Sequence, residues 1–173
     1  MRWFWIDRFT EFRSGHSATA LKSVSLSEDY LHDHFPAYPV MPASLILEGL
    51  AQTAGLLIGE HSGFTQRVIL AKVSRVQFRF LALPGDTLTY RATIIDINED
   101  GAMAKTTSHV GDRLQGEADI FFAHIKDDVA GEDLFEPQGF LDLLRMLRMF
   151  EVGRQSDGSP IEVPEKFRHL QGA

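Results

Sequence analysis

The sequence has 173 residues, 44% of them hydrophobic and 24% charged, which is the composition of one globular domain with a sizeable core. It contains no cysteine, and this excludes disulfide bonds, thiolate nucleophiles and cysteine-ligated zinc. The net charge of −7 argues against nucleic-acid binding, because nucleic-acid-binding proteins present a basic face. No apolar run approaches the roughly 18 residues of a membrane span, and the N-terminus lacks a signal-peptide core. We therefore expect a cytoplasmic protein with no membrane span.

The first half of the chain predicts two strands and one buried helix. Residues 3–13 are rich in aromatic side chains and predict a strand, and residues 18–26 predict its antiparallel partner. After a proline-rich loop, residues 44–60 have the length and residue types of a helix. This helix is apolar nearly all round, which is typical of a helix in the protein interior.

The second half predicts further strands separated by turn signals rich in Gly, Asp and Asn. These strands are expected at residues 67–83, 86–100, 101–112 and 113–125. Strands on both sides of one buried helix predict an α+β fold in which an antiparallel sheet packs on a central helix.

Residues 126–173 form a C-terminal extension to the domain predicted for residues 1–125. An acidic segment leads to apolar residues at helical spacing, which predict an amphipathic helix near residues 138–152. Such a stripe usually belongs to a core, so we expect the helix to pack on the sheet or on a neighbouring subunit. A lid or a partner-binding element is the alternative.

Glu48 and Gln52 are the strongly polar residues inside the predicted central helix, and they share one face because they are four residues apart. A buried carboxylate costs several kcal/mol unless it is paired or protonated. Two interpretations of Glu48 are therefore open: an acid in an active site, or a member of a structural hydrogen-bond network.

The loop "HDHFPAYPVMPAS" (residues 32–44) leads into the helix, and its three prolines restrict the backbone. His34, held in this loop, is a candidate general base. The backbone N–H of Ala43, at the helix N-terminus, is suited to stabilise a developing negative charge. His32 and His34 can also be surface residues; as a metal pair without a third ligand they are a weak motif, and we expect no metal.

The segment "HFPAYPVMPASLILEGLAQTAGLL" (residues 34–57) resembles the signature of the hotdog-fold 3-hydroxyacyl-[acyl-carrier-protein] dehydratases of the FabA/FabZ family. The resemblance continues in "VQFRFLALPGDTL" (residues 76–88) and covers roughly residues 5–125. Glutamate at position 48 favours the FabZ-like branch over the FabA-like branch, whose members also isomerise the double bond. The resemblance implies a hotdog fold, an antiparallel sheet wrapped around one long helix, here with an extra C-terminal helical segment.

The resemblance also implies a mechanism. His34 would remove the α-proton of a 3-hydroxyacyl thioester, and Glu48 would protonate the departing β-hydroxyl, giving a trans-2-enoyl thioester and water. The Ala43 N–H would polarise the thioester carbonyl, and Gln52 would orient Glu48 or the leaving water. General acid–base catalysis of this kind needs no cofactor.

Two positions depart from the family pattern, which has glycine where this chain has Ala37 and Ala43. Both alanines keep the backbone N–H and add a Cβ close to the expected substrate-binding loop. Because the N–H groups remain, we expect activity to be possible, and altered substrate choice or weak activity are the alternatives.

The resemblance implies partners as well. Histidine and carboxylate come from different subunits in such enzymes, so we expect a homodimer, alone or in a trimer of dimers. The substrate would be carried by acyl carrier protein or coenzyme A. Lys72, Arg75 and Arg79 are candidates for docking the acidic carrier, or are simply solvated charges on a strand.

Two other functions stay open for the same fold. A hotdog thioesterase would hydrolyse the thioester, and a non-catalytic hotdog subunit would only bind acyl groups. The presence of both His34 and Glu48 favours dehydration.

Overall fold

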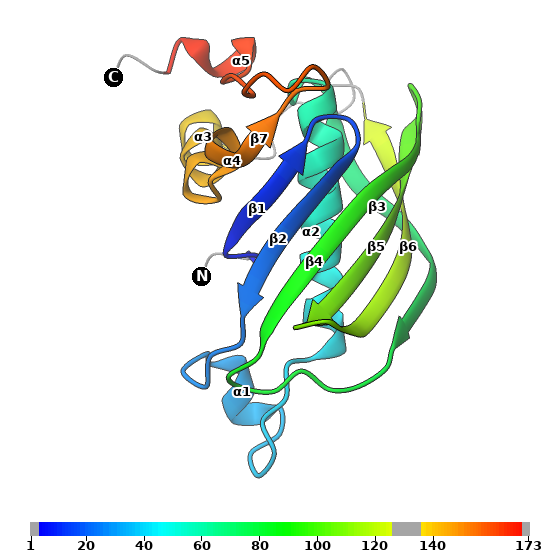
Figure 1. The fold of residues 1–173 in the computed structure, drawn as a ribbon, viewed down its shortest axis with the longest axis vertical. Coiled ribbons are helices and arrows are strands. Elements are labelled where there is room, and N and C mark those ends of the chain that lie inside the picture. The colour runs from blue at the N-terminus through cyan, green and yellow to red at the C-terminus, as the bar shows by residue number, and fades with distance from the viewer. Residues whose placement is uncertain (1–3, 126–135, 171–173) are drawn as a thin grey trace.

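The computed structural model describes residues 4–125 and 136–170, in which one seven-stranded sheet wraps around a long helix (Figure 1). That helix is α2, Ala43–His61. The strands are β1 (Arg8–Arg13), β2 (Ser17–Ser23), β3 (Arg67–Phe78), β4 (Thr87–Ile97), β5 (Gly101–Val110), β6 (Arg113–Ile125) and β7 (Gly153–Arg154). The short helices are α1 (Tyr30–Asp33), α3 (Pro137–Met146), α4 (Met149–Val152) and α5 (Glu165–Arg168).

The strand order is β3-β6-β5-β4-β2-β1-β7, and all neighbours are antiparallel except β1 and β7. This confirms the predicted α+β architecture with one central helix. The predicted strands over 67–83 and 86–100 are shorter in the structure, because the chain leaves the sheet after Phe78 and rejoins it at Thr87. None of the helices in the described residues combines the length and hydropathy needed to cross a membrane.

Helix α2 lies in the groove of the sheet and packs closely on β4. It starts after Pro42, whose extended backbone (φ −55°, ψ 133°) presets the turn into the helix. Gly49 is required where α2 crosses β4, because a Cβ at this position would overlap the buried ring of Tyr90. The buried face of α2 is mainly aliphatic, with Leu50, Ala54 and Leu57, and it also carries the polar Thr53 and Glu60.

The predicted helix near 138–152 is two helices in the structure. The carboxylate of Glu136 caps α3 by accepting hydrogen bonds from the N–H groups of Gln138 (2.9 Å) and Gly139 (2.6 Å). Arg148 then adopts a left-handed conformation (φ 62°), which ends the first helix and turns the chain into α4. From α4 the chain enters β7, which pairs with β1.

The C-terminal extension shares the core of the sheet and α2. The N–H of Phe9 in β1 donates to the carbonyl of Leu147 at 2.9 Å. Leu144, Ile161 and Phe167 are buried in the same apolar cluster as Phe9. The extension therefore packs on its own chain and covers the C-terminal end of α2 (Figure 1).

The two edges of the sheet differ in length and exposure. Strand β7 has two residues, whereas β3 has twelve and is exposed along most of its length. Ile69, Leu70 and Val76 of β3 are 38–46% exposed. A long apolar edge of this kind can accept another strand.

Candidate active site

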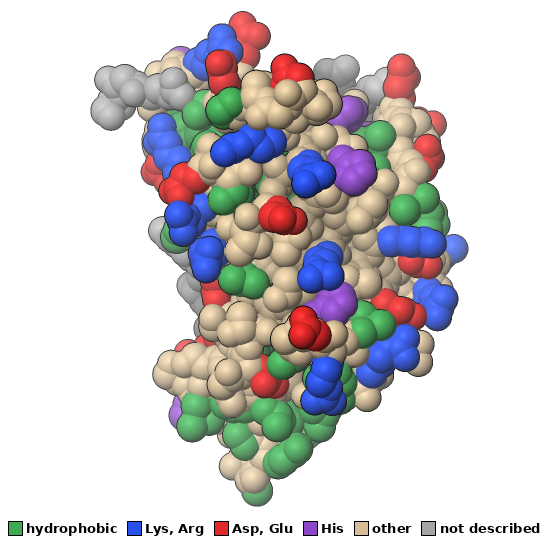
Figure 2. Space-filling model, in the orientation of Figure 1, with side chains coloured by type: hydrophobic (Ala, Val, Ile, Leu, Met, Phe, Trp, Pro, Cys, Tyr) green, Lys and Arg blue, Asp and Glu red, His purple; other side chains and the backbone are tan. Residues whose placement is uncertain are grey.

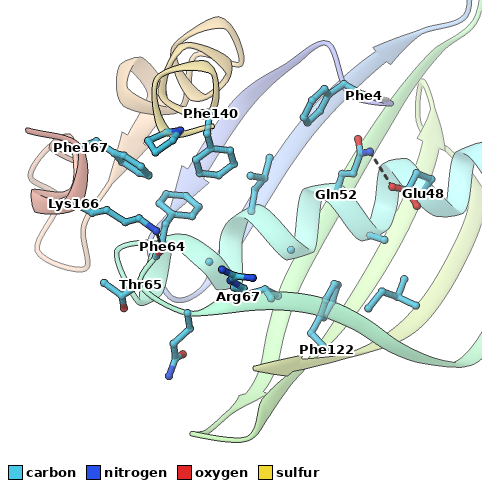
Figure 3. Close-up of a pocket in the computed structure, with 18 residues that line it drawn as sticks. Phe4, Glu48, Gln52, Phe64, Thr65, Arg67, Phe122, Phe140, Lys166 and Phe167 are labelled. Carbon is cyan, nitrogen blue, oxygen red and sulfur yellow. Dashed lines mark hydrogen bonds between the residues drawn. The ribbon is translucent and has the colours of Figure 1, made fainter. Parts of the chain in front are cut away.

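A cavity of about 490 Å³ runs along one face of α2, between the helix and β3 (Figure 3). Glu48, Gln52, Gly55 and Gly59 line it from the helix. These positions repeat at intervals of three or four residues, so they form one stripe. Val68 and Leu70 contribute from β3, which places the cavity next to the exposed sheet edge.

Glu48 is held in the cavity by a chain of hydrogen bonds. The backbone N–H of Trp5 donates to Gln52 Oε1 at 2.8 Å, and Gln52 Nε2 donates to Glu48 Oε1 at 3.0 Å. Because the Trp5 N–H can only donate, it selects the amide orientation that points the Gln52 NH₂ group at Glu48. The half-buried Glu48 carboxylate is thus oriented and keeps one oxygen for a ligand.

His34 lies in the loop that precedes α2. Its Nδ1 is 3.1 Å from the carbonyl oxygen of Val40, and since a carbonyl only accepts, Nδ1 carries the proton. That tautomer leaves the lone pair on Nε2, as a general base requires. The loop is closed by the Val40 N–H, which donates to the carbonyl of His34 at 2.9 Å, and the imidazole stacks on Phe35 at 4.3 Å.

The structure brings Glu48 and Gln52 together but does not bring His34 to them within one chain. Glu48 lines the cavity, whereas His34 is absent from its lining among the described residues. Ala43 is the first residue of α2 and is exposed, and Ala37 is exposed in the loop. The loop lies beyond the N-terminal end of α2 (Figure 1).

The surface around this loop is apolar. Figure 2 shows hydrophobic side chains gathered at the lower end of the molecule, over the loop and the α1 region. The exposed side chains there include Leu26, Phe35, Tyr38, Leu81 and Leu83. A contiguous exposed apolar surface of this kind marks an interaction site.

Lys72, Arg75 and Arg79 lie outside the cavity. Arg75 and Arg79 share one carboxylate, that of Glu117, at 2.9 and 3.6 Å. Lys72 lies over the Phe121 ring at 5.9 Å from its centroid. The positive charge of the two arginines is therefore partly neutralised, although both side chains remain accessible.

Two tyrosines near the Glu48 site have buried hydroxyl groups: Tyr90, which packs against Gly49, and the partly buried Tyr30, which packs against Trp5. Burial is the main cause that raises the pKa of both Tyr30 and Tyr90, so both stay neutral at physiological pH. Tyr30 packs edge-on against Trp5 at 5.3 Å, which helps to hold the segment that donates to Gln52. Within residues 4–125 and 136–170, no cluster of His, Asp or Glu side chains is arranged to hold a metal ion.

The far end of the cavity is built by residues that sequence analysis did not identify. Phe64, Phe140 and Phe167 lie there, from the end of α2, from α3 and from α5. Phe140 belonged to the predicted amphipathic stripe, but that pattern carried no sign of a pocket. Phe167 sits in a polar segment without any periodic signal.

The sheet, the central helix and the cavity define a protein of the hotdog class. Among solved structures, the crystal structure of AziG from S. sahachiroi has this fold, with a TM-score of 0.58 and 15% identity over 69% of this chain and 90% of that chain.

Sequence comparison assigns the family. The FabA-like domain matches residues 3–115, so the chain belongs to the FabA-like domain family. Several similar proteins carry the name 3-hydroxyacyl-[acyl-carrier-protein] dehydratase FabZ, and two of them serve as examples. The relative from Desulforamulus reducens is 31% identical over 119 residues, covering 68% of this chain and 84% of its own. The relative from Listeria welshimeri is 35% identical over 119 residues, covering 68% and 83%.

Proposed function

We propose that this protein is a 3-hydroxyacyl-[acyl-carrier-protein] dehydratase of fatty-acid synthesis, acting in the cytoplasm as a homodimer. The observation that carries the proposal is the carboxylate of Glu48, held by Gln52 at 3.0 Å at one end of an apolar cavity. The names of the FabZ relatives supply the reaction and the carrier.

The proposed chemistry is an elimination of water. His34 Nε2 takes the proton from the α-carbon, and the electron pair of that C–H bond forms the new C=C bond. The C–O bond at the β-carbon breaks, and Glu48 gives its proton to the departing hydroxyl, which leaves as water. The Ala43 N–H, at the N-terminus of a nineteen-residue helix, is suited to donate to the thioester oxygen as negative charge builds on it. Gln52 is the positioning residue for Glu48.

The site is proposed to be shared between two subunits. Three observations support this: Glu48 lines a cavity next to the exposed β3 edge, His34 lies outside the lining of that cavity, and apolar side chains are exposed around the His34 loop. Antiparallel pairing of the two β3 edges about a two-fold axis would join the sheets. The histidine of one subunit would then serve the glutamate of the other.

Carrier docking is assigned to Lys72, Arg75 and Arg79 on the outside of the molecule. Arg75 and Arg79 are more than 40% exposed in their side chains while they contact Glu117. An acidic carrier protein would compete with Glu117 for the two guanidinium groups.

The proposal is tested by mixing two inactive variants, His34→Ala and Glu48→Gln, and following enoyl and free-thiol formation from 3-hydroxybutyryl-ACP. If each site takes His34 from one subunit and Glu48 from the other, a mixed dimer has one intact site. Random exchange then restores about a quarter of the wild-type rate, since half of the dimers are mixed and each has one good site of two. Restoration without mixing of subunits, or no restoration, would contradict the shared site.

The product identifies the reaction. Enoyl thioester from the wild type supports dehydration. Free thiol would mean a thioesterase, and the absence of both products would mean a hotdog subunit that binds acyl groups without transforming them.

A further inference from the structure

We propose that the C-terminal extension forms the end wall of the acyl pocket, with Phe140 and Phe167 setting the longest acyl chain that the enzyme accepts. This inference rests on the proposed function, because it takes the ligand of the cavity to be the acyl chain of the thioester substrate. The extension lies outside residues 3–115, the part of the chain that matches the FabA-like domain.

The path for the chain starts at Glu48, where the β-carbon must lie, and follows the stripe of Gln52, Gly55 and Gly59. Glu48 and Gly59 are about three helical turns apart, or roughly 16 Å. Gly55 lines this path and leaves room there for a methyl group, since a Cβ built on it would be in ordinary contact with the Phe122 ring at 3.5 Å. Beyond Gln52 the walls are mainly apolar, which suits a hydrocarbon chain.

Three phenylalanine rings close the far end (Figure 3). The ring of Phe64 lies 5.2 Å from that of Phe140 at an angle of 80°, and Phe140 lies 5.9 Å from Phe167. Gly59 permits this closure, because a Cβ there would be only 3.0 Å from the Phe64 ring. Two of the three rings belong to the extension, so the extension makes most of the wall.

The wall is fastened to the end of α2. The N–H of Phe64 donates to the carbonyl of Gly59 at 2.8 Å, which holds Phe64 in a left-handed conformation (φ 59°). Lys166, next to Phe167 in α5, donates from Nζ to the carbonyl of Phe64 at 3.4 Å. Phe167 is 2% exposed, so its ring is part of the core and not a loose flap.

The dimensions set the length of the ligand. After subtracting about 4 Å for contact with the end wall, roughly 12 Å of path remain for carbons beyond the β-carbon. An extended chain advances about 1.2 Å per bond, so the pocket holds about ten further carbons. The proposed substrates are therefore short and medium-chain 3-hydroxyacyl thioesters with an apolar end.

The test is the chain-length profile of kcat/KM for the full-length protein with 3-hydroxyoctanoyl-, 3-hydroxydodecanoyl- and 3-hydroxyhexadecanoyl-ACP. We expect the wild type to lose at least about tenfold in kcat/KM between the twelve- and sixteen-carbon substrates. Phe140→Ala should raise the ratio of sixteen- to eight-carbon activity by about tenfold, because it opens the wall. Phe140→Trp should lower the ratio of twelve- to eight-carbon activity. Opposite shifts from one position cannot both arise from misfolding.

Phe150→Ala is the matched control, an aromatic truncation in α4 of the same extension that does not line the cavity. Its length ratios should equal those of the wild type. Unchanged ratios in both Phe140 variants, or the same change in Phe150→Ala, would overturn the end wall.

A binding measurement separates this inference from the proposed function. Dissociation constants of saturated eight-, twelve- and sixteen-carbon acyl-ACP are measured by calorimetry for the same proteins. Suppose that no substrate is dehydrated, but that affinity shows the same length limit and changes in the same direction in the Phe140 variants. The dehydratase proposal is then wrong and the proposed end wall is supported. If binding is independent of length in every variant, the wall is refuted whatever the activity.

Discussion

The two ends of helix α2 are covered in different ways. At the C-terminal end, Phe64, Phe140 and Phe167 of the same chain pack into one aromatic cluster, and Phe167 is buried. At the N-terminal end, Ala43 is exposed and Phe35 in the adjoining loop is 56% exposed.

This difference shows which parts of the site one chain completes. The extension supplies much of the far wall of the cavity, where Phe140 and Phe167 lie with Lys166. The N-terminal end carries the loop with His34 and is open in the single chain. Under the proposed homodimer, the acyl pocket would be closed at one end by its own chain and at the other by the partner.

The largest effect is expected from replacing the proposed acid, Glu48, in the N-terminal half of α2. Glu48→Gln keeps the size of the side chain but loses the transferable proton, so we expect kcat to fall by about 10²–10⁴-fold. Stability should change little, because the amide can still contact Gln52. Steady-state kinetics and thermal unfolding check this, with Glu11→Gln, at an exposed position of β1, as control. A Glu48→Gln enzyme within tenfold of wild type would remove Glu48 from the mechanism.

A substitution at the β3 edge tests whether a second copy covers the N-terminal end of α2. Val76→Lys places a charge on β3 of each subunit, where a two-fold axis brings the charges near one another. We expect the dimer dissociation constant to rise by about a hundredfold or more, with loss of activity in parallel.

Sedimentation at micromolar concentration measures this effect. Ile95→Lys is the control, because Ile95 is equally exposed (51%) but lies on the interior strand β4. A Val76→Lys protein that remains dimeric would place the interface elsewhere.

Between the two ends, the Gln52 side chain positions Glu48. Gln52→Ala removes the 3.0 Å contact to Glu48 and leaves the Trp5 N–H without this acceptor. A hydrogen bond of this kind is worth about 1 kcal/mol, so we expect kcat to fall about five- to tenfold. KM should change less than kcat, because substrate binding relies on the apolar walls. An equal effect of Gln77→Ala, on exposed β3, would mean that the loss is not specific to Glu48.

A matched pair of glycines compares the packed and the open face of α2. Gly49→Ala should destabilise the fold by about 1–3 kcal/mol, because the new methyl group overlaps Tyr90. Gly55→Ala should stabilise it by about 0.5–1 kcal/mol, since its Cβ meets only the Phe122 ring at 3.5 Å and alanine favours helix. Urea unfolding measures both. If Gly55→Ala lowered the free energy of unfolding more than Gly49→Ala does, the cavity beside Gly55 would be filled in solution.

The smallest effect is expected at the covered C-terminal end, at Glu60. Burial raises the pKa of this carboxyl, while a hydrogen bond from Ser14 and the nearby His61 act against the rise. The unfolded chain therefore ionises first as the pH increases, and the native state loses stability above the ordinary carboxyl pKa of about 4.3. Glu60→Gln should raise Tm by about 2–4 °C at pH 7.

Repeating the Glu60→Gln melt at pH 3.5 supplies the control. Both forms of the side chain are then neutral, so the difference between variant and wild type should disappear. A difference that persists at pH 3.5 would mean that charge burial is not its cause.

The fold was predictable to the extent that it depends on local pattern. The apolar run at residues 44–60 predicted α2 to within one residue at each end, because a helix that is apolar nearly all round has a clear composition. The strand alternation predicted β1 to β6 and the antiparallel sheet. The position of Glu48 and Gln52 on one face followed from their spacing alone.

The remaining features depend on tertiary packing. Residues 64, 140 and 167 meet only after α3 and α5 fold back on α2, and no periodic pattern links them. The break between α3 and α4 lies at Arg148 in a left-handed conformation, a position where the sequence has neither glycine nor proline. The two-residue β7 is too short for any strand pattern.

That short strand governs how copies of this protein can add to one another. Strand β7 pairs with the side of β1 that would otherwise be the second free edge of the sheet. It has two residues, Gly153 and Arg154, with which a strand of another copy could pair. A sheet with two long open sides could grow end to end into a filament, because each added copy would expose a fresh side. Within the described residues β3 is the long free edge, so copies that pair through it as proposed would leave no long edge open, and growth would stop at a closed pair. The turn at Arg148, which leads the chain into α4 and then β7, would in this way limit assembly to two copies.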